Sequence, residues 1–382
     1  MSPREVVVVG GSTAGATVLR ELRARGYEGR LTLVDPEPGT NRPPLSKAVL
    51  ADAGAEASVL MDHASLEVEH VLAPASGLDH PARTLLTADG GAHRFDALVI
   101  ATGSRARRIA APGQEGEVVL RSVQDARALR GRFAEASSAV VVGAGFLGLE
   151  VATAAAKAGL RVTVVDVDPP LERLLGEHLA SAVGERARAL GIGFRRSGAA
   201  LVGHPVRGVR LDGGEELAAD VVVSCVGDEP VTEWLGDASP ELEHGVVIDD
   251  HARTSLAGVY AAGDVAAVRT GGGVRRAPFW ANAVTQGRVA AASVLGQPVD
   301  DPIVDHYFWT DIAGTAIKVV GPLPLAGSPR VLEDAGSGHG LLAWDTSTVA
   351  AFGIRRSLPR LRATLRELSG PPPSTEHDAG AT

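Results

Sequence analysis

Short runs of valine and leucine, each followed by a turn or a charged residue, dominate the hydrophobic pattern of the chain. The first run, Val6–Val9, leads into Gly10 and Gly11. A helical pattern follows through Arg25, and the next apolar run ends at Asp35. Continuous apolar runs of this length are typical of strands that are buried on both faces of a parallel sheet. The N-terminal segment therefore predicts a strand, a glycine-rich turn, a helix and a second strand.

The same order of elements recurs farther along the chain. Ala139–Val142 precedes Gly143, a helical pattern runs through Ala158, and the strand pattern that follows ends in an acid, Asp166. In a dinucleotide-binding βαβ unit the glycines let the backbone approach a pyrophosphate at a helix N-terminus, and the acid accepts hydrogen bonds from a ribose diol. Two copies predict two dinucleotide-binding sites; the alternative is two ordinary glycine turns in an α/β domain. In the first copy, Ser12 replaces the middle glycine.

The rest of the pattern predicts further strands, two more helices and a polar tail. In chain order we expect short strands in residues 68–100, a strand in Asp220–Gly227, a strand and turn in Val259–Val268, a helix over Trp280–Leu295, an antiparallel sheet in 305–350, a helix over Leu358–Leu368 and a disordered tail over 369–382.

Composition narrows the class of protein. A length of 382 residues suggests two or three domains, and 45% hydrophobic residues are enough for buried cores. The net charge of −9 argues against nucleic-acid binding, which depends on neutralising phosphates. Cys225 is the only cysteine, which excludes a disulfide framework and a cysteine-pair redox centre. No apolar run reaches about 18 residues without a charge, so we expect no membrane span and a cytoplasmic protein.

Seven segments carry a more specific pattern: GGSTAG at 10–15, RPPLSK at 42–47, ATGS at 101–104, GAGFLGLE at 143–150, YAAGDV at 260–265, WANAVTQG at 280–287 and YFWTD at 307–311. Together they resemble the bacterial ferredoxin reductases of class I oxygenase and cytochrome P450 systems, which belong to the glutathione-reductase-like flavoproteins. The resemblance implies an α/β fold with two Rossmann-like dinucleotide-binding domains, one inserted in the other, and a small C-terminal α+β domain. We therefore expect an FAD-binding domain of residues 1–108 and 242–303, an NAD-binding domain of 109–241, a C-terminal domain of 304–368 and the tail.

The resemblance also assigns residues to FAD. The first glycine turn and Asp35 would hold the pyrophosphate and the adenosine ribose, Arg42 would contact the adenosine side, and Trp309 would border the flavin edge where electrons leave. Arg42 is alternatively a surface charge, and the tryptophans are alternatively core aromatics. The expected FAD residues are Gly10, Gly11, Ser12, Ala14, Gly15, Asp35, Arg42, Lys47, Ala101, Thr102, Gly103, Gly263, Asp264, Trp280, Ala281 and Trp309.

On the nicotinamide side, the resemblance places a glutamate, Glu150, near the nicotinamide ring and Lys47. We expect these two residues to be catalytic: the lysine would stabilise the electron-rich reduced flavin, and the glutamate would hold the lysine in place. Both are alternatively solvated surface charges. The expected NAD residues are Gly143, Gly145, Phe146, Leu147, Gly148, Glu150 and Asp166.

The implied activity is NADH:ferredoxin oxidoreductase. Hydride would pass from NADH to FAD, and single electrons would then pass to a 2Fe–2S ferredoxin that supplies an oxygenase or P450. We expect NADH to be preferred over NADPH, because Asp166 would repel a 2′-phosphate and no base follows it until Arg173. No histidines or cysteines are spaced as metal ligands, so we expect no metal. The alternatives are a reductase or oxidase of a small molecule with the same fold, and a slow-turnover redox-sensing interaction protein.

A basic segment near the C-terminus is the expected ferredoxin-docking face. Ferredoxins are usually acidic, and this chain is acidic overall, so a local basic face is needed to steer the encounter. A solvated helix face is the alternative. The segment contains Arg355, Arg356, Arg360, Arg362 and Arg366.

Overall fold

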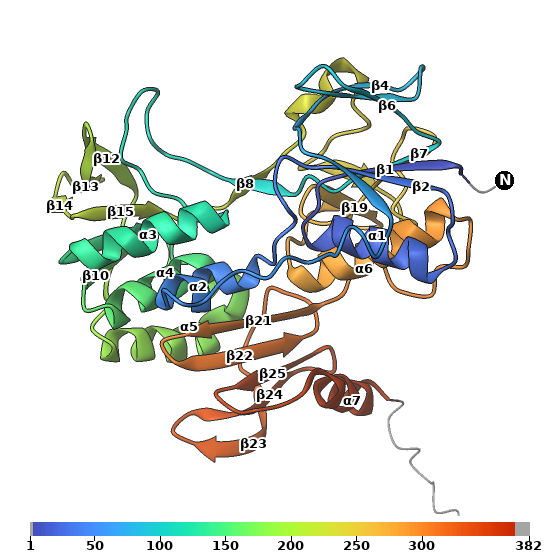
Figure 1. Cartoon of the computed structure of the whole chain (residues 1–382). Coiled ribbons are helices and arrows are strands. Elements are labelled where there is room, and N and C mark those ends of the chain that lie inside the picture. The colour runs from blue at the N-terminus through green and yellow to red at the C-terminus, as the bar shows by residue number, and fades with distance from the viewer. Residues whose placement is uncertain (1–2, 371–382) are drawn as a thin grey trace, which may run out of the picture.

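The first run of valines forms the centre of a parallel sheet in the computed structural model, which describes residues 3–370. Val6–Val9 is at most 2% exposed, because both faces of the sheet are covered. Helices α1 and α6 lie side by side on one face, and the β4–β6 sheet lies on the other (Figure 1). The strand order is β18 (Val259–Ala261), β7 (Ala97–Ile100), β1 (Glu5–Val9), β2 (Arg30–Val34), β3 (Val68–Val71), with α1 (Thr13–Ala24) and α6 (Trp280–Val294).

Smaller elements complete this part of the molecule. Two three-stranded sheets flank the parallel sheet, and two short helices follow the turn after β2. The elements are η1 (Pro43–Ser46), α2 (Ala48–Ala51), β4 (Ala75–Asp79), β5 (Thr84–Thr87), β6 (Ala92–Arg94), β17 (Val246–Ile248), β19 (Ala266–Thr270) and β20 (Gly273–Arg275).

A second parallel sheet lies between β7 and β18 in the chain. Its strand order is β11-β10-β9-β15, and every neighbouring pair is parallel. Three helices and a small antiparallel sheet accompany it. The elements are α3 (Val123–Glu135), β9 (Ser138–Val142), α4 (Phe146–Lys157), β10 (Arg161–Asp166), α5 (Glu172–Ala189), β11 (Gly193–Arg196), β12 (Ala199–Gly203), β13 (Val206–Leu211), β14 (Glu216–Ala218) and β15 (Val221–Ser224). The short helix η2 (Glu233–Ala238) comes after this segment and packs against β4 of the first part.

The chain crosses between the two parallel sheets twice, and the two crossings pair with each other. β8 (Ser104–Ala106) leaves the first sheet and β16 (Asp228–Pro230) returns to it. They form a two-stranded antiparallel ribbon in which Ser104 lies opposite Pro230. The ribbon runs between the two halves of the molecule in Figure 1.

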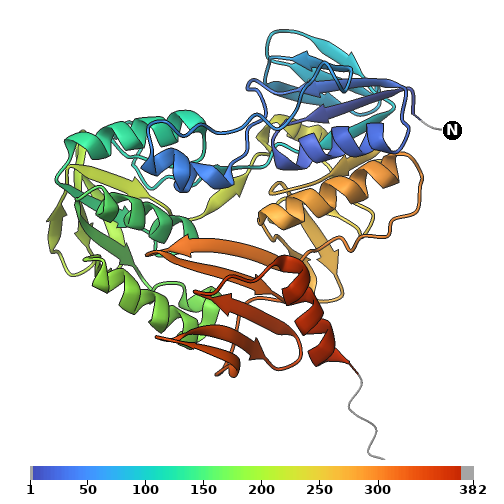
Figure 2. The same cartoon turned by 60° about the horizontal axis from the view of Figure 1, so that its bottom comes forward.

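The C-terminal part is an antiparallel five-stranded sheet with one helix. Its order is β21-β22-β25-β24-β23, and Figure 2 shows it in front of the other two parts, with α7 at its side. β21 packs against both α4 and α6, so it contacts both of the other parts. The elements are β21 (Tyr307–Ile312), β22 (Thr315–Val320), β23 (Arg330–Gly336), β24 (His339–Trp344), β25 (Thr348–Phe352) and α7 (Leu358–Ser369).

This architecture confirms the predicted fold class: two Rossmann-like parallel sheets, one interrupting the other, and a small C-terminal α+β part. One predicted boundary is wrong. Ser369, which we expected to begin the tail, is the last residue of α7, where its hydroxyl donates to the carbonyl oxygen of Leu365 at 2.9 Å. The rest of the predicted tail, from residue 371, lies outside the described residues.

Candidate active site

The first glycine turn opens onto a cavity of about 260 Å³ at the carboxyl ends of the first sheet. Gly10 has φ +99°, and a Cβ there would lie 2.3 Å from the carbonyl oxygen of Ala101. Glycine is therefore required for β1 and β7 to end side by side at the cavity. The predicted residues that line it are Gly10, Ser12, Ala14, Asp35, Arg42, Lys47, Ala101, Thr102, Gly103, Glu150, Gly263, Asp264 and Trp280.

Asp35, at the end of β2, fixes the shape of this turn. One carboxylate oxygen accepts the backbone N–H of Gly11 at 2.5 Å, and the other accepts the N–H of Glu37 at 2.9 Å. The acid therefore lies at the mouth of the glycine turn, where a ribose diol is bound in a dinucleotide-binding unit.

Two arginines and one aspartate give the cavity a positive region. Arg121 Nη2 lies 2.8 Å from Asp264 Oδ2, and Arg42 Nη1 donates to the carbonyl oxygen of Arg121 at 2.6 Å. Burial, and then the neighbouring charge of Arg121, lower the pKa of the Arg42 guanidinium from its usual range. Two guanidinium groups beside one carboxylate suit an anion such as a pyrophosphate. Our sequence analysis missed Arg121, which lies outside every motif.

The predicted catalytic pair is brought together at one side of this cavity. Lys47 Nζ lies 2.9 Å from Glu150 Oε1, and Glu150 is only 7% exposed. The carboxylate also accepts hydrogen bonds from the Ser46 hydroxyl and, at 2.6 Å, from the Thr310 hydroxyl. A buried carboxylate with three donors is fully paired. Ser46 and Thr310 lie inside two of the quoted segments, so a signal for them existed.

Aromatic side chains border the same region. Trp280, the first residue of α6, lines the cavity and is 41% exposed, which excludes the alternative of a core aromatic. Trp309 lies outside the cavity, with its ring centroid 5.4 Å from that of Trp280 in an edge-to-face contact. Tyr307 stacks on Trp309 with a centroid distance of 5.8 Å. The cavity therefore has a half-exposed aromatic edge.

The second glycine turn opens onto a second cavity, of about 530 Å³. Gly143 has φ +106°, and a Cβ there would lie 2.2 Å from the carbonyl oxygen of Cys225. A Cβ at Gly145 would meet no atom within 4 Å, so this position faces open space. Asp166 accepts the N–H of Ala144 at 2.6 Å, which repeats the arrangement of Asp35 in the first turn. The predicted residues that line this cavity are Gly143, Gly145 and Asp166.

The structure also shows a base near Asp166 that linear spacing did not reveal. Arg196, on β11, is the parallel-pairing partner of Asp166, and its Nε donates to the carbonyl oxygen of Val167 at 3.1 Å. Arg173 pairs with Asp168, the next acid along the chain. Both acids and bases therefore surround the end of β10.

Several predicted residues lie beside the cavities rather than in their walls. Ala281 is buried within α6, and Phe146 packs against Phe308 with a centroid distance of 4.8 Å. These residues contribute to the packing under the two turns. Outside the cavity walls are Gly11, Gly15, Ala281 and Trp309 for the first cavity, and Phe146, Leu147 and Gly148 for the second.

The residues present fit two dinucleotides. Each turn has the positive-φ glycine that brings the backbone to the cavity, and each is followed by a helix N-terminus and an acid. Ser12, the N-cap of α1, makes no capping bond to its own helix, so the first N–H groups of α1 remain for an anion. Gly145 leaves the space that a close backbone approach to a pyrophosphate requires.

Cys225, whose carbonyl oxygen contacts the second turn, has a thiol pKa raised to about 12, mainly by burial and secondarily by Glu150. The thiol therefore stays protonated at neutral pH and is a poor nucleophile.

No helix among residues 3–370 has the length and apolar composition that a membrane crossing requires.

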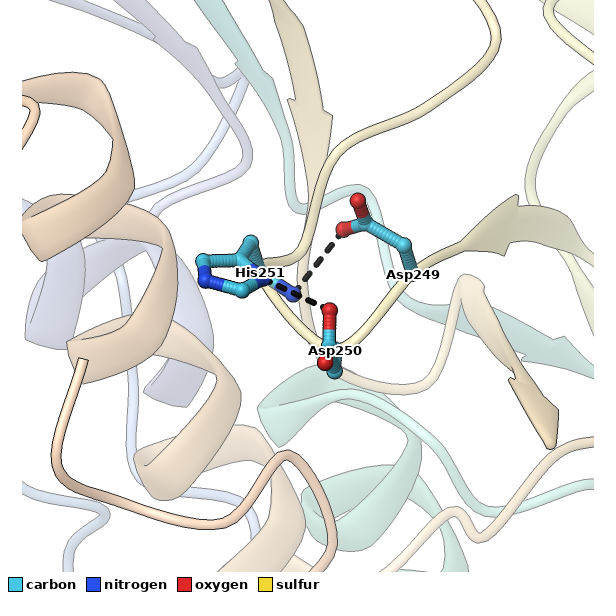
Figure 3. Close-up of side chains that lie close together, drawn as sticks. All are labelled: Asp249, Asp250 and His251. Atoms are coloured by element: carbon cyan, nitrogen blue, oxygen red, sulfur yellow. Dashed lines mark hydrogen bonds and ion pairs between the residues drawn. The ribbon is translucent and has the colours of Figure 1, made fainter.

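Within residues 3–370, one group of side chains lies close enough together to hold a cation: Asp249, Asp250 and His251 (Figure 3). Asp249 already accepts the backbone N–H of His251 at 2.9 Å and that of Arg253 at 2.8 Å. His251 Nδ1 lies 2.6 Å from Asp250 Oδ1. These bonds account for the group as an ordinary hydrogen-bonded turn after β17.

Comparisons with known proteins agree with this geometry. A family model described as pyridine nucleotide-disulphide oxidoreductase matches residues 4–287. A rubredoxin-NAD(+) reductase from Pseudomonas putida is 35% identical over 335 residues, covering 83% of this chain and 86% of that protein. The ferredoxin–NAD(+) reductase component of a biphenyl dioxygenase system from Paraburkholderia xenovorans (strain LB400) is 36% identical over 348 residues, covering 87% and 85%. A solved structure of the covalent putidaredoxin reductase–putidaredoxin complex matches with a TM-score of 0.86 and 26% identity, covering 96% of this chain and 93% of that one.

These matches confirm the predicted oxidoreductase class and the predicted use of FAD and a nicotinamide dinucleotide. The disulphide of the family's name has no counterpart here, since the chain has one cysteine. The chain belongs to the pyridine nucleotide-disulphide oxidoreductase family.

Proposed function

We propose that this protein is an FAD-dependent NADH:ferredoxin oxidoreductase. The observation that carries the proposal is the position of Glu150. It lies on α4, the helix that begins at the second glycine turn, yet it lines the first cavity and pairs with Lys47 there. The helix of the second dinucleotide unit therefore supplies a buried carboxylate to the first cavity, and this link between the two units suits direct transfer between two cofactors.

In this proposal, residues 1–108 and 242–303 bind FAD, residues 109–241 bind NADH, and residues 304–368 form the C-terminal domain. When bound, FAD takes two electrons from NADH as hydride and can release them one at a time, as a 2Fe–2S cluster requires. Lys47 places a positive charge in the wall of the first cavity, and Glu150 holds that charge in position. Arg121 binds the pyrophosphate of FAD, and Asp35 binds its adenosine ribose. Because Arg42 is hydrogen-bonded to Arg121, we also assign Arg42 to the pyrophosphate in place of the adenosine contact that the resemblance implied.

The proposed electron acceptor is a 2Fe–2S ferredoxin that supplies an oxygenase or cytochrome P450. Support comes from the relatives, whose names describe reductases of rubredoxin and of dioxygenase ferredoxins, and from the structural neighbour solved with putidaredoxin. The proposed electron donor, NADH, is a metabolite of the cytoplasm, so we also propose a cytoplasmic location.

The purified protein is expected to carry one FAD per chain and to lose its flavin absorbance when NADH is added without oxygen. Stopped-flow mixing of the reduced protein with a 2Fe–2S ferredoxin, with rubredoxin, with a quinone dye and with oxygen then identifies the acceptor. Reoxidation by ferredoxin is expected to be the fastest. A protein that neither contains flavin nor takes it up contradicts the proposal, and faster reoxidation by the dye or by oxygen contradicts the ferredoxin assignment.

The structure refines the docking surface expected from the basic segment. Arg356 pairs with Glu333, and Arg362 pairs with Asp305, so these two charges are partly neutralised. Arg355 is exposed. Its neighbour Arg356 accepts a hydrogen bond, through its carbonyl oxygen, from Lys318 Nζ at 2.9 Å, and Lys318 is the cross-strand neighbour of Trp309. Arg355 and Arg356 are therefore linked through Lys318 to the strand that carries Trp309.

Arg355→Glu is expected to raise the KM for ferredoxin by roughly tenfold at low salt and to weaken its salt dependence, because a steering charge is reversed. NADH-to-dye turnover should not change. Arg132→Glu is the matched control, since it is an exposed arginine on α3, in the second part of the molecule. If the two variants have the same KM for ferredoxin, Arg355 is not part of the docking surface.

A further inference from the structure

Ser12 occupies the position in the first turn where the dinucleotide-binding pattern has its middle glycine. Its backbone, with φ −76° and ψ −157°, is extended and open to any residue. Gly145, the equivalent residue of the second turn, has nearly the same backbone at φ −75° and ψ −173°. The chain itself therefore does not require glycine at this position in either turn, and the serine causes no strain.

The hydroxyl of Ser12 has two partners, both outside its own helix. It donates to the carbonyl oxygen of Thr40 at 3.1 Å and accepts from Arg42 Nε at 3.3 Å. A serine at an N-cap ordinarily accepts a backbone N–H of the first helical turn, but here it makes no such bond. The hydroxyl therefore connects the glycine turn to the segment that carries Arg42.

That connection restricts Arg42 on two sides. Nε is held by Ser12, and Nη1 is held by the carbonyl oxygen of Arg121. Its third nitrogen, Nη2, has no hydrogen-bond partner among residues 3–370. The arginine also lines the first cavity. A guanidinium fixed by two of its nitrogens loses less conformational freedom when it binds a phosphate with the third.

We infer that Ser12 is a positioning residue for Arg42 and that it strengthens FAD binding through that arginine. The inference rests on the proposed FAD site. In the first turn, a protein with glycine at position 12, the ordinary residue of the pattern, therefore binds FAD more weakly than the protein with serine does.

Titration of the apo-protein with FAD, followed by flavin fluorescence, tests this directly. Ser12→Gly and Ser12→Ala are expected to raise the Kd for FAD by about tenfold, the effect of losing a hydrogen bond to a charged group. Ser12→Thr, which keeps the hydroxyl, should stay within about twofold of wild type. Ser239→Ala, which removes a hydroxyl that donates to Gly236, is the control and should bind as wild type does.

A double-mutant cycle with Arg42→Ala separates positioning from a direct contact. If Ser12 acts through the arginine, Ser12→Ala has no further effect in the Arg42→Ala background. Additive losses, or a Ser12→Gly protein that binds FAD as tightly as wild type, overturn the inference. Thermal unfolding of the apo-variants identifies any that fail to fold. Ser12→Gly decides the question in that case, because glycine already occupies nearly the same backbone conformation in the second turn. A wild-type protein that binds no FAD contradicts the proposed function instead.

Discussion

Replacing Lys47 with alanine is expected to slow the loss of flavin absorbance on NADH addition by about 100-fold, while the Kd for NADH changes by less than about threefold. The lysine brings an ammonium group to the wall of the first cavity and is held there by Glu150, on α4, at 2.9 Å. A fixed positive charge stabilises the negative charge that develops as the flavin is reduced. Because that charge is absent before the reaction, the loss falls on the rate and not on binding.

Glu150→Gln is expected to give a smaller defect of about tenfold, since the ammonium remains but its ionic partner is lost. Lys157→Ala provides the matched control: this lysine is exposed at the end of the same helix, α4. Anaerobic stopped-flow measurements over a range of NADH concentrations separate rate from affinity. If both the Lys47 and the Glu150 variants reduce the flavin at the wild-type rate, the ion pair has only a structural role.

Changing Asp166 to asparagine is expected to lower the preference for NADH over NADPH by about 100-fold. In the wild type the carboxylate at the end of β10 would accept a hydrogen bond from the ribose 2′-OH and repel a 2′-phosphate. Arg196 lies beside it on β11, and Arg173 lies farther along the same wall. Once the negative charge is removed, these guanidinium groups are left to attract the phosphate.

The ratio of kcat/KM for the two nucleotides measures this effect. Asp168→Asn is the control for a general change in local charge, because Asp168 pairs with Arg173 and lines the same cavity. Its effect on the ratio should be several times smaller. A wild-type protein that prefers NADPH, or an Asp166→Asn protein with an unchanged ratio, would show that the carboxylate does not select the nucleotide.

The sequence predicted those parts of the site that depend on local order. Gly10, Asp35, Gly143 and Asp166 belong to short units in which the spacing of strand, turn, helix and acid fixes the geometry. The structure gives each acid the same role, since each accepts a backbone N–H of its own turn. Nothing outside the unit is needed for that arrangement, and so a linear pattern was enough.

The residues that the sequence analysis missed depend on partners far away in the chain. Arg121 reaches Asp264 across 143 positions, and Thr310 reaches Glu150 across 160. Arg196 comes next to Asp166 only through strand pairing. A motif can contain such a residue, as it does for Thr310, but no periodicity or motif specifies its partner, because the partner is set by how the three parts of the molecule pack together.

The basic segment near the C-terminus shows the same limit in its charges. In the sequence it has five arginines and one acid, Glu367, between Gly353 and Leu368, which favours a single positive face. In the structure Arg356 and Arg362 meet acids supplied by β23 and by the segment before β21. A charge run in a folded domain is therefore reduced by neighbours that the linear count does not contain.

The paired ribbon of β8 and β16 makes the middle of the chain topologically separable from the rest. Because Ser104 lies opposite Pro230, residues 105–229 leave and return at nearly the same point, so their removal would require only a tight turn to rejoin the ends. The shortened chain would retain every strand of the first parallel sheet. It would nevertheless lack Arg121 and Glu150, two of the charged groups in the wall of the first cavity. The connectivity of the chain would therefore allow the inserted segment to be removed, but the first cavity would lose charged groups that the segment supplies.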